Sequence, residues 1–201
     1  MKLAARLALL AVATLLAACA ARRVAPPPAD LVRRVALLPP YDPPDRSAVT
    51  RVFTFYSWVA ETRQQAPTML AQAVAAQLQA RGIAVVDADR VTAASGGRAP
   101  QTLTEARALI EHAGLDVPAL YLNLEKYEAS DHDFPAYVDV ALDATLLAPG
   151  SGAILWTTHR AARPVATRGS TSLPDAYQSA ATTVAADLVG DWGTATADRV
   201  P

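Results

Sequence analysis

The sequence contains a single cysteine, Cys19, so no disulfide bond can form within one chain. Lysine is also scarce, because only Lys2 and Lys126 are lysines among the 18 basic residues. The formal net charge is −1 at pH 7, without the positive excess that marks a nucleic-acid-binding surface. These scarcities exclude a disulfide scaffold and argue against nucleic acid as a partner.

The chain also lacks the short motifs of common active sites, namely the G-x-S-x-G turn, the P-loop and G-x-G-x-x-G. The cluster Asp131, His132 and Asp133 fits a solvated hairpin loop better than a metal site, which needs more ligands. Asp139 and Asp143 share a strand face about 13 Å apart, too far for an acid–base pair. We therefore expect no catalytic residue, no metal and no cofactor, and the protein is predicted not to be an enzyme.

No apolar run is long enough to span a bilayer, which needs about 20 residues. The longest one, Leu7–Ala18, has twelve residues and is interrupted only by Thr14. Lys2 and Arg6 precede it, and no acid does. A basic start, a short apolar run and small residues after it are typical of a secretory signal, so residues 1–18 are predicted to be cleaved.

The signal ends in Leu16–Cys19, a leucine and two alanines before the cysteine, which resembles the lipobox of bacterial lipoproteins. The resemblance implies that the Cys19 thiol is acylated after cleavage. A buried cysteine in an ordinary secreted protein is the alternative, but it does not account for the position of Cys19, where the lipobox requires a cysteine. Ala20, where an aspartate would favour the inner membrane, indicates the periplasmic face of the outer membrane.

Cleavage leaves residues 19–201, which contain 16 basic and 19 acidic residues and carry a formal charge of −3. This length suits one domain. Residues 19–30 include Pro26, Pro27 and Pro28 and are predicted to be the lipidated N-terminus and a stiff tether. Residues 31–194 form the expected domain, and residues 195–201 a flexible tail.

Alternating or β-branched stretches predict strands, and helical periodicity with capping residues predicts helices. The expected strands are 32–38, 52–56, 83–86, 120–124, 138–146 and 154–157. The expected helices run from Pro67 to Gly82, from the capping box at Thr102 to Gly114, and from Ser172 to Trp192. The predicted fold is a single α/β (α+β) domain with a mixed, mostly antiparallel sheet and helices packed on one face.

Candidate partner-binding residues lie around the expected strand 52–56. Both faces of this strand are partly apolar, and an exposed apolar face at Tyr56 is a hypothesis for contact with a partner or with lipid. Trp58 is expected to leave the strand and enter a loop, where a core position is the alternative to partner contact. Glu61 follows in the same segment.

The order of several segments is similar to that of the ABC-type transport auxiliary lipoproteins, the PqiC-type components of lipid transport systems with MCE domains. The resemblance extends over roughly residues 32–192, and the order of its segments is more specific than any one of them. The segments are Val35–Pro39, Pro44–Arg51, Tyr56–Glu61, Met69–Leu70, Leu124–Tyr127, Pro149–Gly150, Arg163–Val165 and Asp191–Trp192.

The resemblance implies a non-enzymatic accessory of an ABC transporter that moves lipid between the two membranes. The expected partners are an MCE-domain periplasmic protein and the ABC transporter subunits, with the membrane bound through the anchor and a homo-oligomer left open. One alternative is an assembly or regulatory lipoprotein of the cell-wall or outer-membrane machinery. A hydrolase is a third reading, and it would need activity that depends on His132.

The anchor is tested by the Cys19→Ser variant. Without a thiol to acylate, the exported protein should move from the membrane fraction to the soluble periplasmic fraction in an immunoblot. An Ala20→Ser variant, which retains the cysteine, serves as the control and should stay with the membrane. Complete membrane attachment of Cys19→Ser would contradict the lipid anchor.

Overall fold

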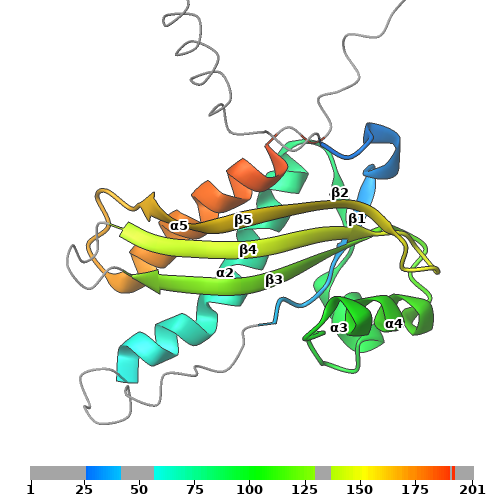
Figure 1. Cartoon of the computed structure of the whole chain (residues 1–201), viewed down its shortest axis with the longest axis horizontal. Helices are drawn as coiled ribbons and strands as arrows, with labels where there is room; N and C mark the ends of the chain where they lie inside the picture. Colours follow the sequence, from blue (N-terminus) through cyan, green and yellow to red (C-terminus); the bar gives the residue numbers. More distant parts are fainter. Residues whose placement is uncertain (1–25, 42–56, 130–136, 191, 193–201) are drawn as a thin grey trace, which may run out of the picture.

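The computed structural model describes residues 26–41, 57–129, 137–190 and Trp192, and it places the side chains of the first long helix from residue 65 onward. In chain order the elements are η1 (Ala29–Leu31), β1 (Arg34–Leu37), α2 (Ser57–Ala80), β2 (Ala84–Val85), α3 (Ala88–Ala94), α4 (Leu103–Ala113), β3 (Ala119–Ala129), β4 (Tyr137–Leu147), β5 (Ile154–Ala166) and α5 (Leu173–Val189). Figure 1 shows these elements around one sheet.

The described strands form a five-stranded sheet in the order β2-β1-β3-β4-β5. Strand β1 runs parallel to both β2 and β3, over short stretches. Strands β3, β4 and β5 form a long antiparallel meander, with β5 at the open edge. The predicted class, a single α/β domain with a mixed sheet dominated by antiparallel pairing, is confirmed.

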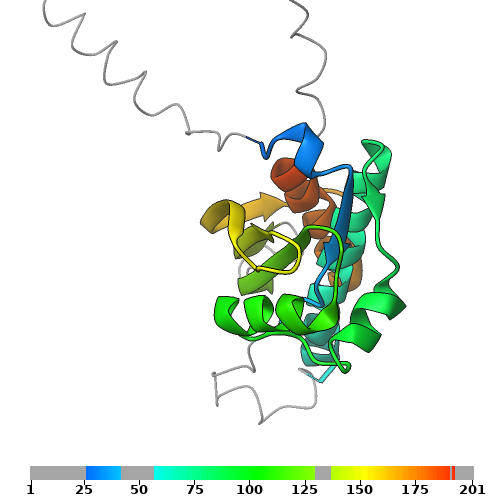
Figure 2. The same ribbon diagram turned by 90° about the vertical axis from the view of Figure 1, so that its right-hand side faces the viewer.

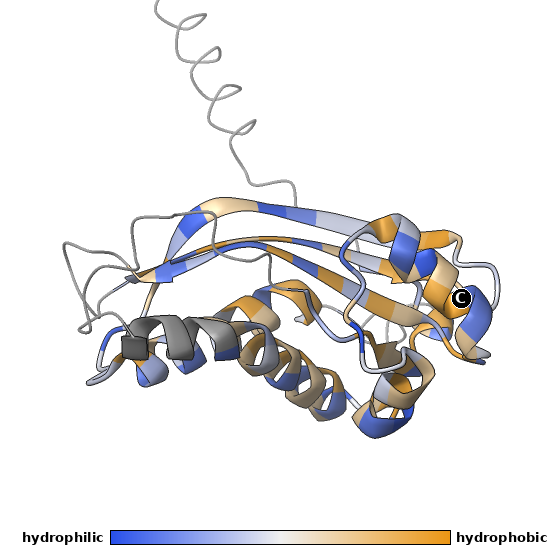
Figure 3. Ribbon diagram, turned by 90° about the horizontal axis from the view of Figure 1, so that it is seen from below, coloured by the Kyte–Doolittle hydropathy of each residue, from blue (hydrophilic) through white to orange (hydrophobic). Residues whose placement is uncertain are grey.

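Helices α2 and α5 pack together over one face of the sheet and bury the main core (Figure 3). Helices α3 and α4 lie against a second, smaller core on the opposite face, at the end where β1 meets β3 (Figure 2). Alternation along β1 explains the division, because Val35 belongs to the main core and Ala36 to the smaller one. The prediction of helices on one face holds for α2 and α5, and the pair α3–α4 adds partial cover to the other.

The caps expected from the sequence begin two of the helices. The Thr102 hydroxyl accepts a hydrogen bond from the Glu105 amide at 3.1 Å, and the Glu105 carboxylate accepts one from the Gln101 amide at 2.7 Å. Ser172 caps α5 by accepting from the Asp175 amide. Gly114 ends α4 in the left-handed conformation, which glycine adopts without steric cost.

Two helices differ from the prediction. Helix α2 begins at Ser57, ten residues before the Pro67 that was expected to start it, so Trp58 lies in a helix and the prediction of a loop there was wrong. Proline marks a helix start because it lacks an amide hydrogen, but α2 accommodates Pro67 internally. Helix α3 was not expected, because it is short and buries only Val91. The expected strand 52–56 lies outside the described residues.

Two pairs of aromatic rings hold the last helix and Trp192, which follows it, against the sheet. Tyr127 of β3 and Tyr177 of α5 meet edge to face at 5.0 Å, and Trp156 of β5 meets Trp192 at 5.1 Å. Buried Tyr127 also donates a hydrogen bond to the Tyr177 carbonyl at 2.6 Å, and burial raises its pKa far above the ordinary value. An ion pair of 3.0 Å from Arg160 to Asp187 adds a polar link between β5 and α5.

The buried hydroxyl of Tyr127 should contribute measurably to stability. Tyr127→Phe removes the hydrogen bond to α5 and should lower the free energy of unfolding by about 1 kcal/mol in urea titrations. The matched control is Tyr137→Phe, at the partly exposed start of β4, whose hydroxyl has no hydrogen bond among the described residues. Equal destabilisation by the two variants would show that the Tyr127 hydrogen bond does not contribute to the free energy of unfolding.

Candidate functional site

The face of the β3–β4–β5 meander opposite α2 and α5 is polar over its middle. Polar and charged side chains of the three strands point to this outer face, and most of them are partly or fully exposed. They are Asn123, Glu125, Lys126, Glu128, Asp139, Asp143, Thr145, Thr157 and His159. The candidate site lies among them.

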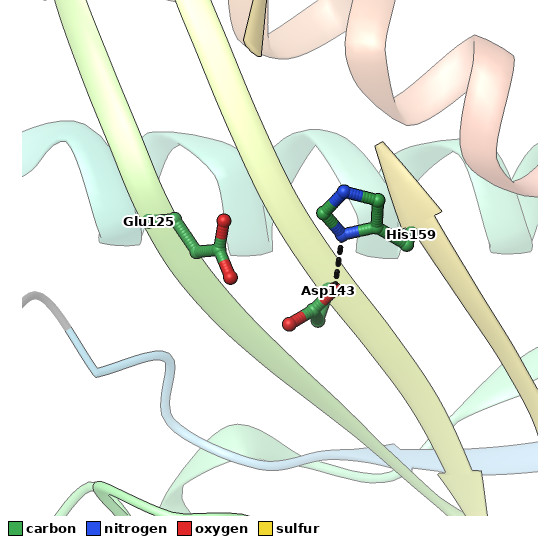
Figure 4. Close-up of side chains that lie close together, drawn as sticks. All are labelled: Glu125, Asp143 and His159. Carbon is green, nitrogen blue, oxygen red and sulfur yellow. Dashed lines mark hydrogen bonds and ion pairs between the residues drawn. The ribbon is translucent and has the colours of Figure 1, made fainter. Parts of the chain in front are cut away.

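Glu125, Asp143 and His159 converge on this face, one from each strand (Figure 4), and we call them the outer-face cluster. One carboxylate oxygen of each acid and one ring nitrogen of the histidine all lie within 4.8 Å of one another. The His159 Nδ1 and the Asp143 Oδ1 form a hydrogen bond of 2.7 Å. Two carboxylates and an imidazole therefore share a small exposed area.

A β-bulge in β3 places Glu125 in the outer-face cluster. Leu124 and Tyr127 both face the main core although they are three positions apart, which in a regular strand would put them on opposite faces, so the strand contains one extra residue. The register shifts between Leu124 and Lys126, and Glu125 has no partner on β4. Both Glu125 and Lys126 consequently point outward, and such re-aiming of side chains is typical of bulges.

A second irregularity brings His159 to the same place. Leu147 pairs with Ile154 next to the turn, and an unbroken ladder would then set Asp143 opposite Thr158. The shift after Leu147 moves the register by one residue, so Asp143 faces His159 instead. Since a one-residue shift moves a side chain to the other face of a sheet, this irregularity places the imidazole outside.

The two acids of the cluster raise the pKa of His159. The hydrogen bond to Asp143 is the main cause that raises the pKa of His159 above 6.5, and the charges of Asp143 and Glu125 act in the same direction. The side chains remain open to solvent, with 59% of His159 and 38% of Asp143 exposed. The arrangement favours a positive charge at the imidazole or beside it.

The neighbouring lysine is engaged elsewhere. Lys126 forms an ion pair of 2.9 Å with Asp139 and a longer one of 3.9 Å with Glu128. The hydrogen bond to Asp139 is also the main cause that raises the pKa of Lys126. Asp139 and Asp143, predicted as a solvated strand face, therefore have different partners on that face.

The predicted partner-binding residues are distant from this cluster in the chain. Trp58 and Glu61 lie in the first turns of α2, three residues apart and hence on one side of the helix. Their side chains, Tyr56, the lipid-anchor residue Cys19 and the segment Asp131–Asp133 lie outside the described part of the structure. These predictions remain predictions.

The outer-face cluster was not predicted from the sequence. Asp143 was recognised as an outward residue of its strand, but His159 was not connected with it. A hairpin turning at Pro149–Gly152 does signal that these two residues lie near each other across the strands. The sequence has no clear sign of the bulges, and without them the face of His159 is assigned wrongly.

A hollow lies over α4, between the loop after α3 and Tyr41. Its polar lining includes Ser95, Gln101, Glu105 and His112. Glu105 is already used as a cap of α4, and Tyr41 is the last described residue before residue 57. The outer-face cluster is therefore the better defined candidate site.

No protein-family model matches the chain, and no curated protein matches it. Solved structures with a similar arrangement include PelC from Paraburkholderia phytofirmans, a dodecamer, with 19% identity, a TM-score of 0.47 and coverage of 83% of this chain and 93% of that one. The lipoprotein GNA1162 from Neisseria meningitidis has 19% identity, a TM-score of 0.45 and coverage of 69% and 87%. Protein XCC0632 from Xanthomonas campestris, of the family DUF330, has 18% identity, a TM-score of 0.42 and coverage of 84% and 90%.

At these identities and TM-scores, the likenesses do not indicate what the present protein binds or assembles with. The resemblance to ABC-type transport auxiliary lipoproteins stays a prediction from the sequence. Among the described residues, no helix is long and apolar enough to cross a membrane.

The link between Asp143 and His159 is open to direct titration. Asp143→Asn removes the carboxylate and should lower the pKa of His159 toward 6.5, measured by NMR of the imidazole with EDTA present. Because the folded-state pKa is raised, the pair contributes stability below about pH 6.5 that is lost as pH rises through the folded-state value. Asp139→Asn, on the same face of β4, should leave the His159 pKa unchanged, and equal effects of both variants would contradict the pairing.

Proposed function

We propose that this protein is a non-enzymatic lipoprotein of the outer membrane that serves as an auxiliary component of an ABC and MCE-type lipid transport system. The observation that carries the proposal is the sequence Leu16–Cys19 at the end of an export signal. The order of segments that resembles the auxiliary lipoproteins supports the choice of system. The chain then belongs at the periplasmic face of the membrane, attached through Cys19.

The start of the domain supports a position close to the membrane. Pro27 is buried, Val32 is 1% exposed and Leu31 packs against the main core, so the chain lies on the domain from about residue 26. Six residues, 20–25, lie between residue 26 and the anchor Cys19. The seven steps from residue 19 to residue 26 reach at most about 25 Å in an extended chain. The domain is consequently held beside the bilayer, where a transport assembly between the membranes must dock.

The character of the outer-face cluster also favours binding over catalysis. Active sites usually exclude water from the reacting groups and bind their ligands in concave pockets. The outer-face cluster lies on an open strand face with the His159 side chain 59% exposed. This setting is more suitable for contact with an ion or with another protein than for a protected reaction.

The first turns of α2 are the proposed partner surface. Trp58 is an aromatic residue of the kind that dominates protein interfaces, and Glu61 lies one turn along the same side of the helix. Tyr56 lies two residues before Trp58 in the sequence and belongs to the same segment. We expect these three residues to contact the MCE-domain protein.

A cross-linked pull-down of the tagged protein at native expression level, followed by mass spectrometry, tests this role. We expect recovery of an MCE-domain protein together with ABC transporter subunits. Trp58→Ala should reduce that recovery several-fold, because loss of an interface anchor typically costs more than 1 kcal/mol. Ile154→Ser, at an exposed apolar residue of β5, is the control and should leave recovery unchanged.

The outcomes of the pull-down test the transport role and the proposed contact surface separately. Recovery of cell-wall synthases or outer-membrane assembly factors in place of the MCE protein would overturn the transport role and favour an assembly or regulatory lipoprotein. Recovery of the MCE protein at the same level with Trp58→Ala would retain the role and place the contact elsewhere. Far-ultraviolet circular dichroism of both variants verifies that α2 remains folded.

A further inference from the structure

The outer-face cluster carries more negative than positive charge. Glu125 and Asp143 bring two carboxylates, and a protonated His159 offsets only one of them. Within the described ranges, neither carboxylate forms an ion pair with a lysine or an arginine. The nearby Lys126 is held by Asp139 and Glu128. A divalent cation that displaces the proton from His159 would neutralise both carboxylates and leave the imidazole as a neutral ligand.

The chemistry of the donors selects among divalent cations. Magnesium and calcium take oxygen ligands, whereas an imidazole nitrogen next to carboxylate oxygens suits first-row transition metals. Zinc binds histidine nitrogen and carboxylate oxygen, and an open zinc site combines three protein ligands with water in the fourth position. The three residue types of the outer-face cluster match that combination.

The geometry requires only side-chain movement. Ligand atoms around a tetrahedral zinc ion lie about 3.3 Å apart, as bond lengths of about 2.0–2.2 Å imply. The donor atoms of the outer-face cluster already lie within 4.8 Å of one another. Antiparallel pairing keeps the three strands in register, and the exposed side chains can rotate. Donor atoms up to 4.8 Å apart would then approach, and the 2.7 Å contact between the His159 Nδ1 and the Asp143 Oδ1 would open.

We propose that Glu125, Asp143 and His159 form a binding site for a divalent transition-metal ion, with zinc as the best match to their donor atoms. Each ligand comes from a different strand, so bound metal connects β3, β4 and β5 across the outer face of the meander. The coordination position left to water is directed toward solvent, where a side chain of another protein can replace it. The site is independent of the transport role and of the lipid anchor.

The test is isothermal titration calorimetry of the full mature protein in detergent with zinc chloride, using protein purified without a histidine tag. The wild type should bind one ion per chain in a saturable manner. Glu125→Gln, Asp143→Asn and His159→Gln each remove one ligand and should weaken binding by at least about tenfold. All variants retain Cys19, so its sulfur cannot explain a difference among them.

Two matched controls test whether binding is local. His112→Gln removes an exposed histidine of α4, and Asp139→Asn removes another outward acid of β4. Both should bind zinc with the wild-type affinity. A second measurement uses Co²⁺, whose visible absorption should report nitrogen and oxygen ligation in the wild type and change in His159→Gln.

Three results would overturn the proposed metal site. Absence of saturable zinc binding by the folded wild type would overturn the proposal. Wild-type affinity in His159→Gln would also overturn it, as would equal losses in the two controls, which indicate diffuse binding to surface charge. Circular dichroism of each variant checks that the sheet is intact, so that loss of a ligand is distinguished from unfolding.

Discussion

The packing of β4 between its neighbours and under α2 and α5 is the constraint on which the rest of the domain depends. Its inward residues Val138, Val140, Leu142, Ala144 and Leu146 are all fully buried in the main core. Because side chains alternate along a strand, this burial also determines that Asp139 and Asp143 point outward. A slip of β4 by one residue would place acidic side chains under the helices in exchange for apolar ones. The cost of burying these acids fixes the register of the strand.

Long, regular features of the fold could be predicted from residue patterns alone. The alternation of 138–146 predicted β4, and capping residues such as Thr102 and Ser172 predicted where α4 and α5 begin. These features are local, since each depends on residues within a turn or a strand. The start of α2 was misjudged because a proline usually marks a helix boundary, and here neighbouring residues continue the helix through Pro67.

The candidate site was harder to predict because it depends on irregularities in two ladders. Asp143 alone has an unremarkable position, and its connection with Glu125 and His159 requires one extra residue in β3 and one in β5. In β3 the extra residue keeps both Leu124 and Tyr127 in the main core and interrupts the regular pairing, a balance between packing and pairing. That balance is a property of the assembled sheet, so no short window of sequence contains it.

The open edge of β5 affects how closely copies of the protein can lie together. Lipid attachment would hold many copies in the plane of one membrane. A strand of 13 residues at the margin of a sheet offers a template for pairing with another chain, and such pairing leads to aggregation. Pro164 has no amide hydrogen to donate, and the interruptions near Leu155 and Ala161 break the strand into short regular stretches. Neighbouring copies would thus find little continuous edge to extend, which allows high surface density without the growth of intermolecular sheets.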